Sequence, residues 1–218
     1  HEVLFNRLED ELIASLRAQY SGSQKEREEM AEQNRKSEGQ LPVSEEEDHN
    51  DRLDQIIDLC VARIIKIERH PKADRLYIET LDDGSGLERV IVSGLVPFYR
   101  EDELLGKNII IVNNLKPAKL RGIESKGMLL AASTKTPEGN DIVEVLTAPK
   151  ANPGERVLPE DIDMENPAET VPKESIDIET FLRIPMYAKD VYAWIKGQRL
   201  MAHGEPIRLE KVMDGKIG

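Results

Sequence analysis

The first hydrophobic pattern in the chain is helical. Leu4, Leu8, Leu12 and Leu16 recur every four residues, which places them on one face of a helix spanning residues 4–19. Small polar residues after this segment end the pattern. We expect this amphipathic helix to dock on a part of a larger protein outside this sequence, and the alternative use of the same apolar stripe is self-association.

Residues 24–52 change to a polar and charged pattern with almost no apolar positions. The segment includes the acidic run Glu45–Asp48. Such a composition buries too little apolar surface to offset the entropy of ordering. The pattern therefore predicts an acidic flexible linker between the helix and the next folded segment.

From residue 53 onwards the hydrophobic pattern is of the β type. Short runs rich in β-branched residues alternate with turn residues, and Asp82–Gly86 is a strong hairpin signal. Strands are expected at 61–67, 76–81, 88–93, 107–113 and 128–133, and a short helix at 96–105. Five short strands with one helix between the third and the fourth predict a mainly β fold, a five-stranded OB-fold barrel over residues 53–150, whose loops and open face bind oligonucleotides.

Residues 151–218 carry weaker patterns. Residues 158–175 are acidic and contain prolines, which indicates an irregular connection. The chain folds again from residue 176, with a hairpin arm at 191–197, and we expect a small C-terminal α/β subdomain here. The single tryptophan, Trp194, is expected to pack in a core or an interface, and base stacking is the alternative.

The net charge of −12 argues against a generic nucleic-acid binder, but the charge is uneven. Residues 1–50 carry 6 Lys or Arg and 13 Asp or Glu, residues 51–134 carry 13 of each, and residues 135–218 carry 11 and 16. The central part is thus the least repulsive to phosphate. The lone Cys60 excludes an intramolecular disulfide, which is typical of a reducing, cytoplasmic compartment, and no apolar run approaches the roughly 20 residues of a membrane span.

Signals for catalysis are weak. The four histidines are scattered, with no metal-ligand spacing, and no phosphate-binding glycine loop is present. Gly84 and Gly86 are explained by a hairpin turn. We therefore expect no active site, no metal and no cofactor in this chain.

The more coherent chemistry is cationic. Lys116, Lys119 and Arg121 surround Pro117 in a segment that we expect to be a rigid loop, and these side chains can hold phosphate groups. A second turn carries further cations, the asparagines before the loop can meet bases or 2′-hydroxyls, and the tyrosine after the second turn could stack a base or belong to the core. These additional candidates are Lys72, Arg75, Tyr77, Asn113 and Asn114. Solvated loop lysines are the alternative explanation.

Several of these residues lie in motifs that resemble a known family. The motifs are His70–Tyr77, Val92–Leu95, Asn114–Gly122 and Ser125–Met128, and their order resembles the tRNA-binding domain of the endothelial monocyte-activating polypeptide II family. The resemblance implies an OB barrel that binds tRNA with broad sequence tolerance. It adds Ser93, Ser125 and Met128 to the candidate site residues. It also implies that residues 151–218 pack on the barrel and imitate the dimer interface of smaller bacterial relatives, which makes a monomeric module.

Residues 4–23 are similar to the end of the anticodon-binding region of methionyl-tRNA synthetases. This implies that the chain is the C-terminal extension of a eukaryotic methionyl-tRNA synthetase, with residues 1–23 closing the synthetase body. Tyrosyl- and lysyl-tRNA synthetases are the alternative parents. The expected partners are tRNA, the catalytic body and other proteins of a synthetase complex, with no membrane.

One segment departs from the resembled family. The cytokine-like heptapeptide of that family aligns with Cys60–Lys66, where its leading arginine is Cys60 and its final threonine is Lys66. A non-catalytic tRNA-binding module is therefore the favoured function, and a cytokine-like or protein-interaction module is the alternative.

Overall fold

The computed structural model describes residues 57–162 and 174–218. They lie in a compact unit that spans residues 50–218. The helix predicted at 4–19 and the linker predicted at 24–52 lie outside the described residues. No helix in the described ranges is long and apolar enough to cross a membrane.

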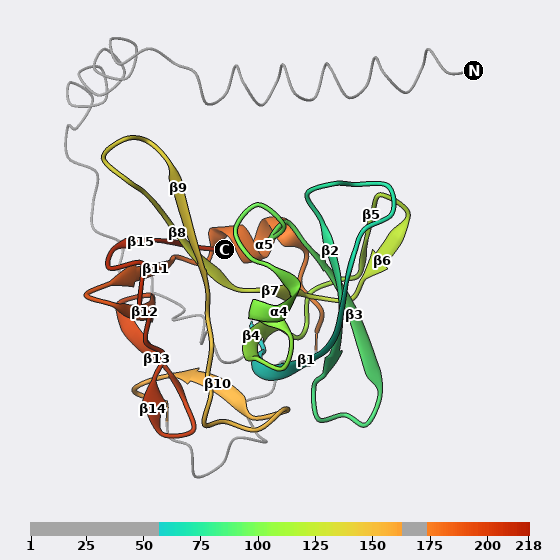
Figure 1. The fold of residues 1–218 in the computed structure, drawn as a ribbon. Coiled ribbons are helices and arrows are strands. Elements are labelled where there is room, and N and C mark those ends of the chain that lie inside the picture. The colour runs from blue at the N-terminus through green and yellow to red at the C-terminus, as the bar shows by residue number, and fades with distance from the viewer. Residues whose placement is uncertain (1–56, 163–173) are drawn as a thin grey trace, which may run out of the picture. The chain divides into compact units, whose positions relative to one another are not determined.

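The described chain is mainly β, as predicted (Figure 1). Strands β1 to β4 build its first part, with the short helix α4 between β3 and β4. The bounds are β1 Leu59–Arg69, β2 Tyr77–Asp82, β3 Glu88–Ser93, α4 Glu101–Leu104, β4 Asn108–Val112, β5 Ala118–Leu120, β6 Ile123–Ser125, β7 Met128–Leu129, β8 Ala131–Lys135 and β9 Asp141–Val145.

The described residues of the second part form one helix and six further strands. Their bounds are β10 Arg156–Pro159, α5 Ile178–Arg183, β11 Met186–Lys189, β12 Tyr192–Ile195, β13 Gln198–Ala202, β14 Glu205–Pro206 and β15 Gly215–Ile217. The hairpin arm predicted at 191–197 corresponds to β12, which lies between β11 and β13.

The strands join into one open antiparallel sheet, in the order β3-β2-β1-β10-β13-β12-β11-β15-β8-β9. Strand β4 pairs with β1 and β7, and β14 pairs with β13. The sheet crosses from the first part to the second at β10, which pairs with β1 on one side and β13 on the other. Within the described ranges, β5 and β6 stand apart as a two-stranded sheet of their own.

Strands β1 and β4 have core on both faces. Leu59 and Val61 face one cluster of buried side chains, whereas Cys60 and Ala62 face a second cluster. All five residues of β4 are buried for the same reason. A strand covered on both faces reads as a continuous apolar run rather than an alternating one, which explains the unbroken aliphatic run at 109–112.

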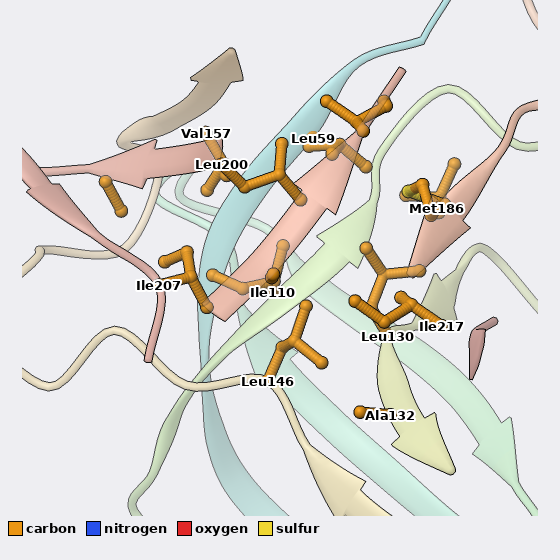
Figure 2. Close-up of a cluster of buried hydrophobic side chains, with 14 of the residues drawn as sticks. Leu59, Ile110, Leu130, Ala132, Leu146, Val157, Met186, Leu200, Ile207 and Ile217 are labelled. Carbon is orange, nitrogen blue, oxygen red and sulfur yellow. The ribbon is translucent and has the colours of Figure 1, made fainter. Parts of the chain in front are cut away.

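The first of these clusters joins the two parts of the chain. Figure 2 shows Ile110 and Leu130 beside Leu200 and Ile217. Burial of each such side chain contributes roughly 1.5–3 kcal/mol. The two parts therefore stabilise each other through a shared core.

Two predicted elements differ from the observed ones. The helix predicted at 96–105 is reduced to α4, because the carbonyl of Tyr99 accepts the hydroxyl of Tyr77 at 2.9 Å and the chain is extended at Arg100. The strand predicted at 128–133 divides into β7 and β8. The break falls at Leu130, whose amide donates to the Ile110 carbonyl at 2.9 Å.

Candidate nucleic-acid interface

The predicted loop that carries the basic motif is a β-hairpin. Strands β5 and β6 pair in register, with Leu120 opposite Ile123. Arg121 and Gly122 form the connection, with φ values of 49° and 95°. Two consecutive positive φ values are the signature of a type I′ turn, which suits a two-residue hairpin. The sequence predicted a loop here, and the structure has a short β-hairpin instead. Strands of three residues are too short to give a recognisable hydrophobic pattern.

Three cations project from this arm into solvent. Lys116 precedes β5, Lys119 lies on it and Arg121 is at the turn, and all three are exposed. The amide of Lys116 donates to the Ile176 carbonyl at 2.8 Å, which fixes the start of the arm. None of the three forms an ion pair with a described residue, whereas Lys66, Lys135 and Lys150 are paired with carboxylates.

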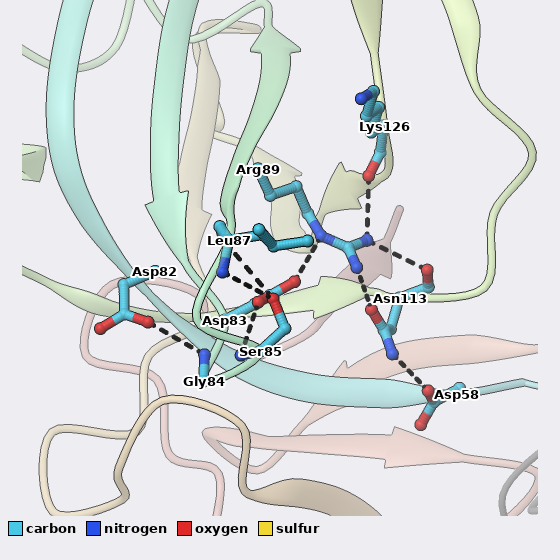
Figure 3. A network of polar contacts seen from close by, with 9 residues as sticks. All are labelled: Asp58, Asp82, Asp83, Gly84, Ser85, Leu87, Arg89, Asn113 and Lys126. Atoms are coloured by element: carbon cyan, nitrogen blue, oxygen red, sulfur yellow. Dashed lines mark hydrogen bonds and ion pairs between the residues drawn. The ribbon is translucent and has the colours of Figure 1, made fainter.

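Arg89 holds the two ends of the arm together (Figure 3). Its Nη1 donates to the carbonyl oxygens of Asn113, at 3.1 Å, and Lys126, at 3.0 Å. These residues lie immediately before and after the segment that carries the hairpin. One guanidinium from β3 thus fixes the base of the arm, and sequence reasoning did not identify it.

Carboxylates complete this network. Arg89 Nε lies 2.7 Å from Asp83 Oδ2, and Asp58 Oδ2 accepts from Asn113 Nδ2 at 2.6 Å. Burial alone would raise the pKa of Asp83, but hydrogen bonds from Ser85 and Arg89 outweigh it and hold that pKa below its usual value. Asp83 therefore stays charged and keeps its hold on Arg89.

The two predicted asparagines take part in the same framework. Asn113 Oδ1 accepts from Arg89 Nη2 at 2.5 Å. Asn114 Oδ1 accepts the amide of Asp58 at 3.0 Å, and its Nδ2 donates to the Glu174 carbonyl at 3.0 Å. Both side chains thus position the arm, a role that the sequence did not predict for them.

The second basic turn is organised by a buried histidine. His70 is 4% exposed, and its Nδ1 accepts the amide of Lys72 at 3.0 Å. Its own amide donates to the Leu76 carbonyl at 2.9 Å, which closes the turn. Lys72 and Arg75 are exposed on this turn and form no ion pair within the described ranges.

The strand register brings the turn and the arm to the same end of β3. Tyr77, which comes directly after the turn, is opposite Ser93 at the end of β3. Ser125 Oγ accepts the amide of Val92 at 3.0 Å, and the amide of Lys126 donates to the Val90 carbonyl. Strand β6 therefore runs antiparallel to β3, so its turn at residues 121–122 lies beyond Ser93, as the basic turn does (Figure 1).

Of the four other predicted site residues, Tyr77 and Ser125 are buried and Ser93 and Met128 are half-buried. Tyr77 is fully buried and has no surface on which a base can stack, so its position is that of the core alternative. Ser125 is 4% exposed, and its hydroxyl also donates to the Gly127 carbonyl at 3.0 Å. Met128 is half-buried and packs against the shared core. Ser93 donates its hydroxyl to Glu79.

Comparisons with known proteins relate the chain to tRNA-binding domains and to methionine–tRNA ligases. Residues 59–156 match the family described as "Putative tRNA binding domain". The chain is 44% identical over 240 residues to a methionine–tRNA ligase of Treponema denticola and 37% identical over 236 residues to that of Treponema pallidum. Each alignment covers 99% of this chain and 29% of the ligase, so the chain spans less than a third of these relatives.

A solved structure shares the fold. The C-terminal domain of Plasmodium vivax p43 superposes with a TM-score of 0.67 and 28% identity, over 75% of this chain and 98% of that one. The two ligases above are bacterial. The sequence predicted a eukaryotic methionyl-tRNA synthetase, but the similarity extends to bacterial methionine–tRNA ligases. The family match is likewise to tRNA-binding domains in general and not to the endothelial monocyte-activating branch in particular.

Proposed function

We propose that this chain binds the tRNA backbone through the β5–β6 arm and the turn before β2. Both elements belong to the tRNA-binding domain at residues 59–156, which is homologous to the C-terminal region of methionine–tRNA ligases. The residues in contact are Lys72, Arg75, Lys116, Lys119 and Arg121. Binding by these side chains is electrostatic and has low sequence specificity, because phosphates carry no base information.

One observation carries the proposal. Five exposed cations lie on two elements at one end of β3, and none of them forms an ion pair with a described carboxylate. Such cations on a prearranged surface release counterions when they meet phosphates, and this release drives tight binding at low salt. Arginine adds a planar fork that can hold one phosphate with two hydrogen bonds.

The relatives support a role for this module within a larger enzyme. We propose that the parent is a methionine–tRNA ligase, that residues 1–23 close its catalytic body and that residues 24–52 act as a tether in the cytoplasm. A short flexible tether raises the effective concentration of bound tRNA near the body to about the millimolar range. The module thereby aids aminoacylation without taking part in the chemistry.

We further propose that residues 53–150 form an OB-type barrel and that residues 151–218 imitate a dimer interface. Closure of the barrel is supported by the hydrogen bonds of Lys126 to Val90 and of Val92 to Ser125 Oγ, which link β3 to the segment after β4. The second point is supported by the shared core at Ile110 and Leu200. A monomer in sedimentation is the expected result.

The test removes the three cations of the arm. The Lys116→Ala, Lys119→Ala, Arg121→Ala triple variant should bind tRNA at least tenfold more weakly at low salt. Its plot of log K against log salt should be flatter by about two, because each lost phosphate contact removes slightly less than one unit of slope. Filter binding at several salt concentrations measures both quantities.

The matched control is Lys66→Ala, Lys135→Ala, Lys150→Ala, which changes the net charge equally but removes lysines already paired with carboxylates. It should leave the affinity within threefold. Equal losses in both triple variants would mean that net charge alone matters and would contradict the proposed site. Retention of full affinity by the arm variant would favour the protein-interaction alternative.

A further inference from the structure

A row of aromatic and cationic side chains crosses strands β11, β12, β13 and β15, which Figure 1 shows on the other side of the view from the β5–β6 arm. Tyr187 on β11 is directly opposite Trp194 on β12. Lys216 on β15 is opposite Tyr187, and Arg199 on β13 is opposite Trp194. Directly opposite residues of antiparallel strands share a face of the sheet, so these side chains form one continuous row over four strands.

The row lies on the outer face of the sheet. The neighbours of its members along the strands, Ala188, Ala193 and Leu200, point the other way and are buried in the shared core. Tyr187 and Trp194 are themselves half-buried, and Lys216 is exposed. The aromatic rings therefore keep part of their surface toward solvent.

The rings are held in a fixed arrangement. The planes of Tyr187 and Trp194 are inclined by only 3°, with centroids 6.4 Å apart. Trp194 Nε1 donates to the Lys189 carbonyl at 3.0 Å, which locks the orientation of the indole. The two rings thus form a parallel, preorganised pair.

A third aromatic residue extends the same face. Tyr192 is opposite Lys189, two residues from Trp194 on the same strand. The guanidinium of Arg199 lies 5.8 Å from the centre of the Tyr192 ring and is ion-paired with Glu160. Only nine aromatic residues occur in the whole chain (3 Phe, 5 Tyr, 1 Trp), so three on one outer face are a marked concentration.

We propose that this aromatic face, made of Tyr187, Tyr192 and Trp194 with Lys189, Arg199 and Lys216, binds unpaired bases of single-stranded RNA. Every base has a face that stacks on an aromatic ring, and cations beside the rings meet the backbone phosphates. The surface goes beyond the proposed contact of the arm with the tRNA backbone and does not depend on it.

Unpaired cations beside the rings favour RNA over a hydrophobic partner. Of the acids near this face, Glu160 is paired with Arg199 and Asp161 accepts from Gln198. Asp214 accepts the amide of Asp190. Lys189 and Lys216 form no ion pair among the described residues, so they can meet the phosphates of a ligand whose bases stack on the rings.

Because Trp194 is the only tryptophan, its fluorescence reports on this face. The experiment titrates the full chain with a twelve-nucleotide oligoadenylate RNA and, separately, with a blunt RNA duplex of equal charge. We expect the single strand to quench the emission and the duplex to leave it unchanged. Tyr187→Leu should weaken the apparent affinity for the single strand at least fivefold, as loss of one stacking ring does.

Two controls make the outcome decisive. Phe98→Leu changes a half-buried aromatic residue that packs against the second core cluster, not the one under this face, and should leave quenching unaltered. The triple Ala variant of the arm should lose tRNA binding but keep the quenching by oligoadenylate within twofold. Absence of quenching at saturating single strand, equal quenching by polyglutamate, or loss of quenching in the arm variant would each overturn the proposal.

Discussion

Glu79 lies on the inner face of β2, between Tyr77 and Leu81, and is fully buried. Burial raises the pKa of its carboxyl to about 7, although the hydrogen bond from Ser93 acts in the opposite direction. Its Oε2 has no hydrogen-bond partner among the described residues. The alternating strand pattern places position 79 inside, but the sequence does not tell how far water is excluded there.

We expect Glu79 to make stability depend on pH. The folded state holds a proton that the unfolded chain releases at its ordinary pKa of 4.5, so the contribution to the free energy of unfolding is largest below pH 4.5. It falls as the pH rises to about 7 and is constant above that. A rise of the pKa from 4.5 to about 7 lowers the free energy of unfolding by about 3 kcal/mol between low and high pH.

The Glu79→Gln variant isolates this effect, because the amide is neutral at every pH. Urea unfolding at pH 4 and pH 8 should show the variant gaining about 3 kcal/mol relative to the unsubstituted protein as the pH rises. A difference between the two proteins that does not change with pH would mean that the Glu79 carboxyl is not perturbed by burial.

At the scale of elements, the β5–β6 arm depends on its turn and on its base. Arg121 and Gly122 supply the positive φ values of the turn, and Arg89 fixes Asn113 and Lys126 at the base. The basic residues of this segment were visible in the sequence. The hairpin was not, because its register depends on the turn geometry and on a guanidinium more than 20 residues away.

Gly122→Ala tests the turn. A Cβ at this position meets nothing within 4 Å, so the cost comes only from the φ of 95° and amounts to about 1 kcal/mol. We expect tRNA affinity to fall severalfold, whereas urea unfolding of the whole chain should change by less than about 0.5 kcal/mol, since β5 and β6 are a separate sheet.

The matched control for this variant is Gly94→Ala, at a glycine that also has open space and whose φ is not positive. It should change neither quantity. If both alanine variants weakened tRNA binding equally, the geometry of the turn would not be what presents the cations.

At the scale of the whole molecule, the two parts of the chain share one sheet and one core. The backbone of Gly215 in β15 lies so close to β8 that an added Cβ would be 2.3 Å from the carbonyl oxygen of Ser133. Strand β15 pairs with β8, so this close approach joins the second part of the chain to the first. The boundary predicted between residues 150 and 151 thus separates two parts that stabilise each other.

We therefore expect Gly215→Ala to destabilise the whole unit. A backbone atom cannot move aside as a side chain can, so the free energy of unfolding should fall by roughly 2 kcal/mol or more. Unfolding followed by Trp194 fluorescence and by far-UV circular dichroism should shift together. Gly218→Ala, where a Cβ has open space, is the control, and a shift confined to the Trp194 signal would indicate independent domains.

The sequence by itself determined the local features of this protein. The β-type pattern predicted β2, β3 and β4 to within a residue or two, because each is a short run of apolar, β-branched residues between turn signals. The motifs between residues 70 and 128 indicated tRNA binding, which the match of residues 59–156 to a tRNA-binding family supports. Both properties are carried by contiguous residues.

Only the tertiary structure decided which candidates are accessible. In the fold, Tyr77 and Ser125 are buried and the side chain of Asn113 is hydrogen-bonded to Asp58. The cations of the arm are exposed. The fold also aligns Tyr187 with Trp194, which no spacing in the sequence reveals. The physical reason is that exposure and cross-strand alignment depend on contacts between distant segments, whereas the strand pattern is set by neighbouring side chains.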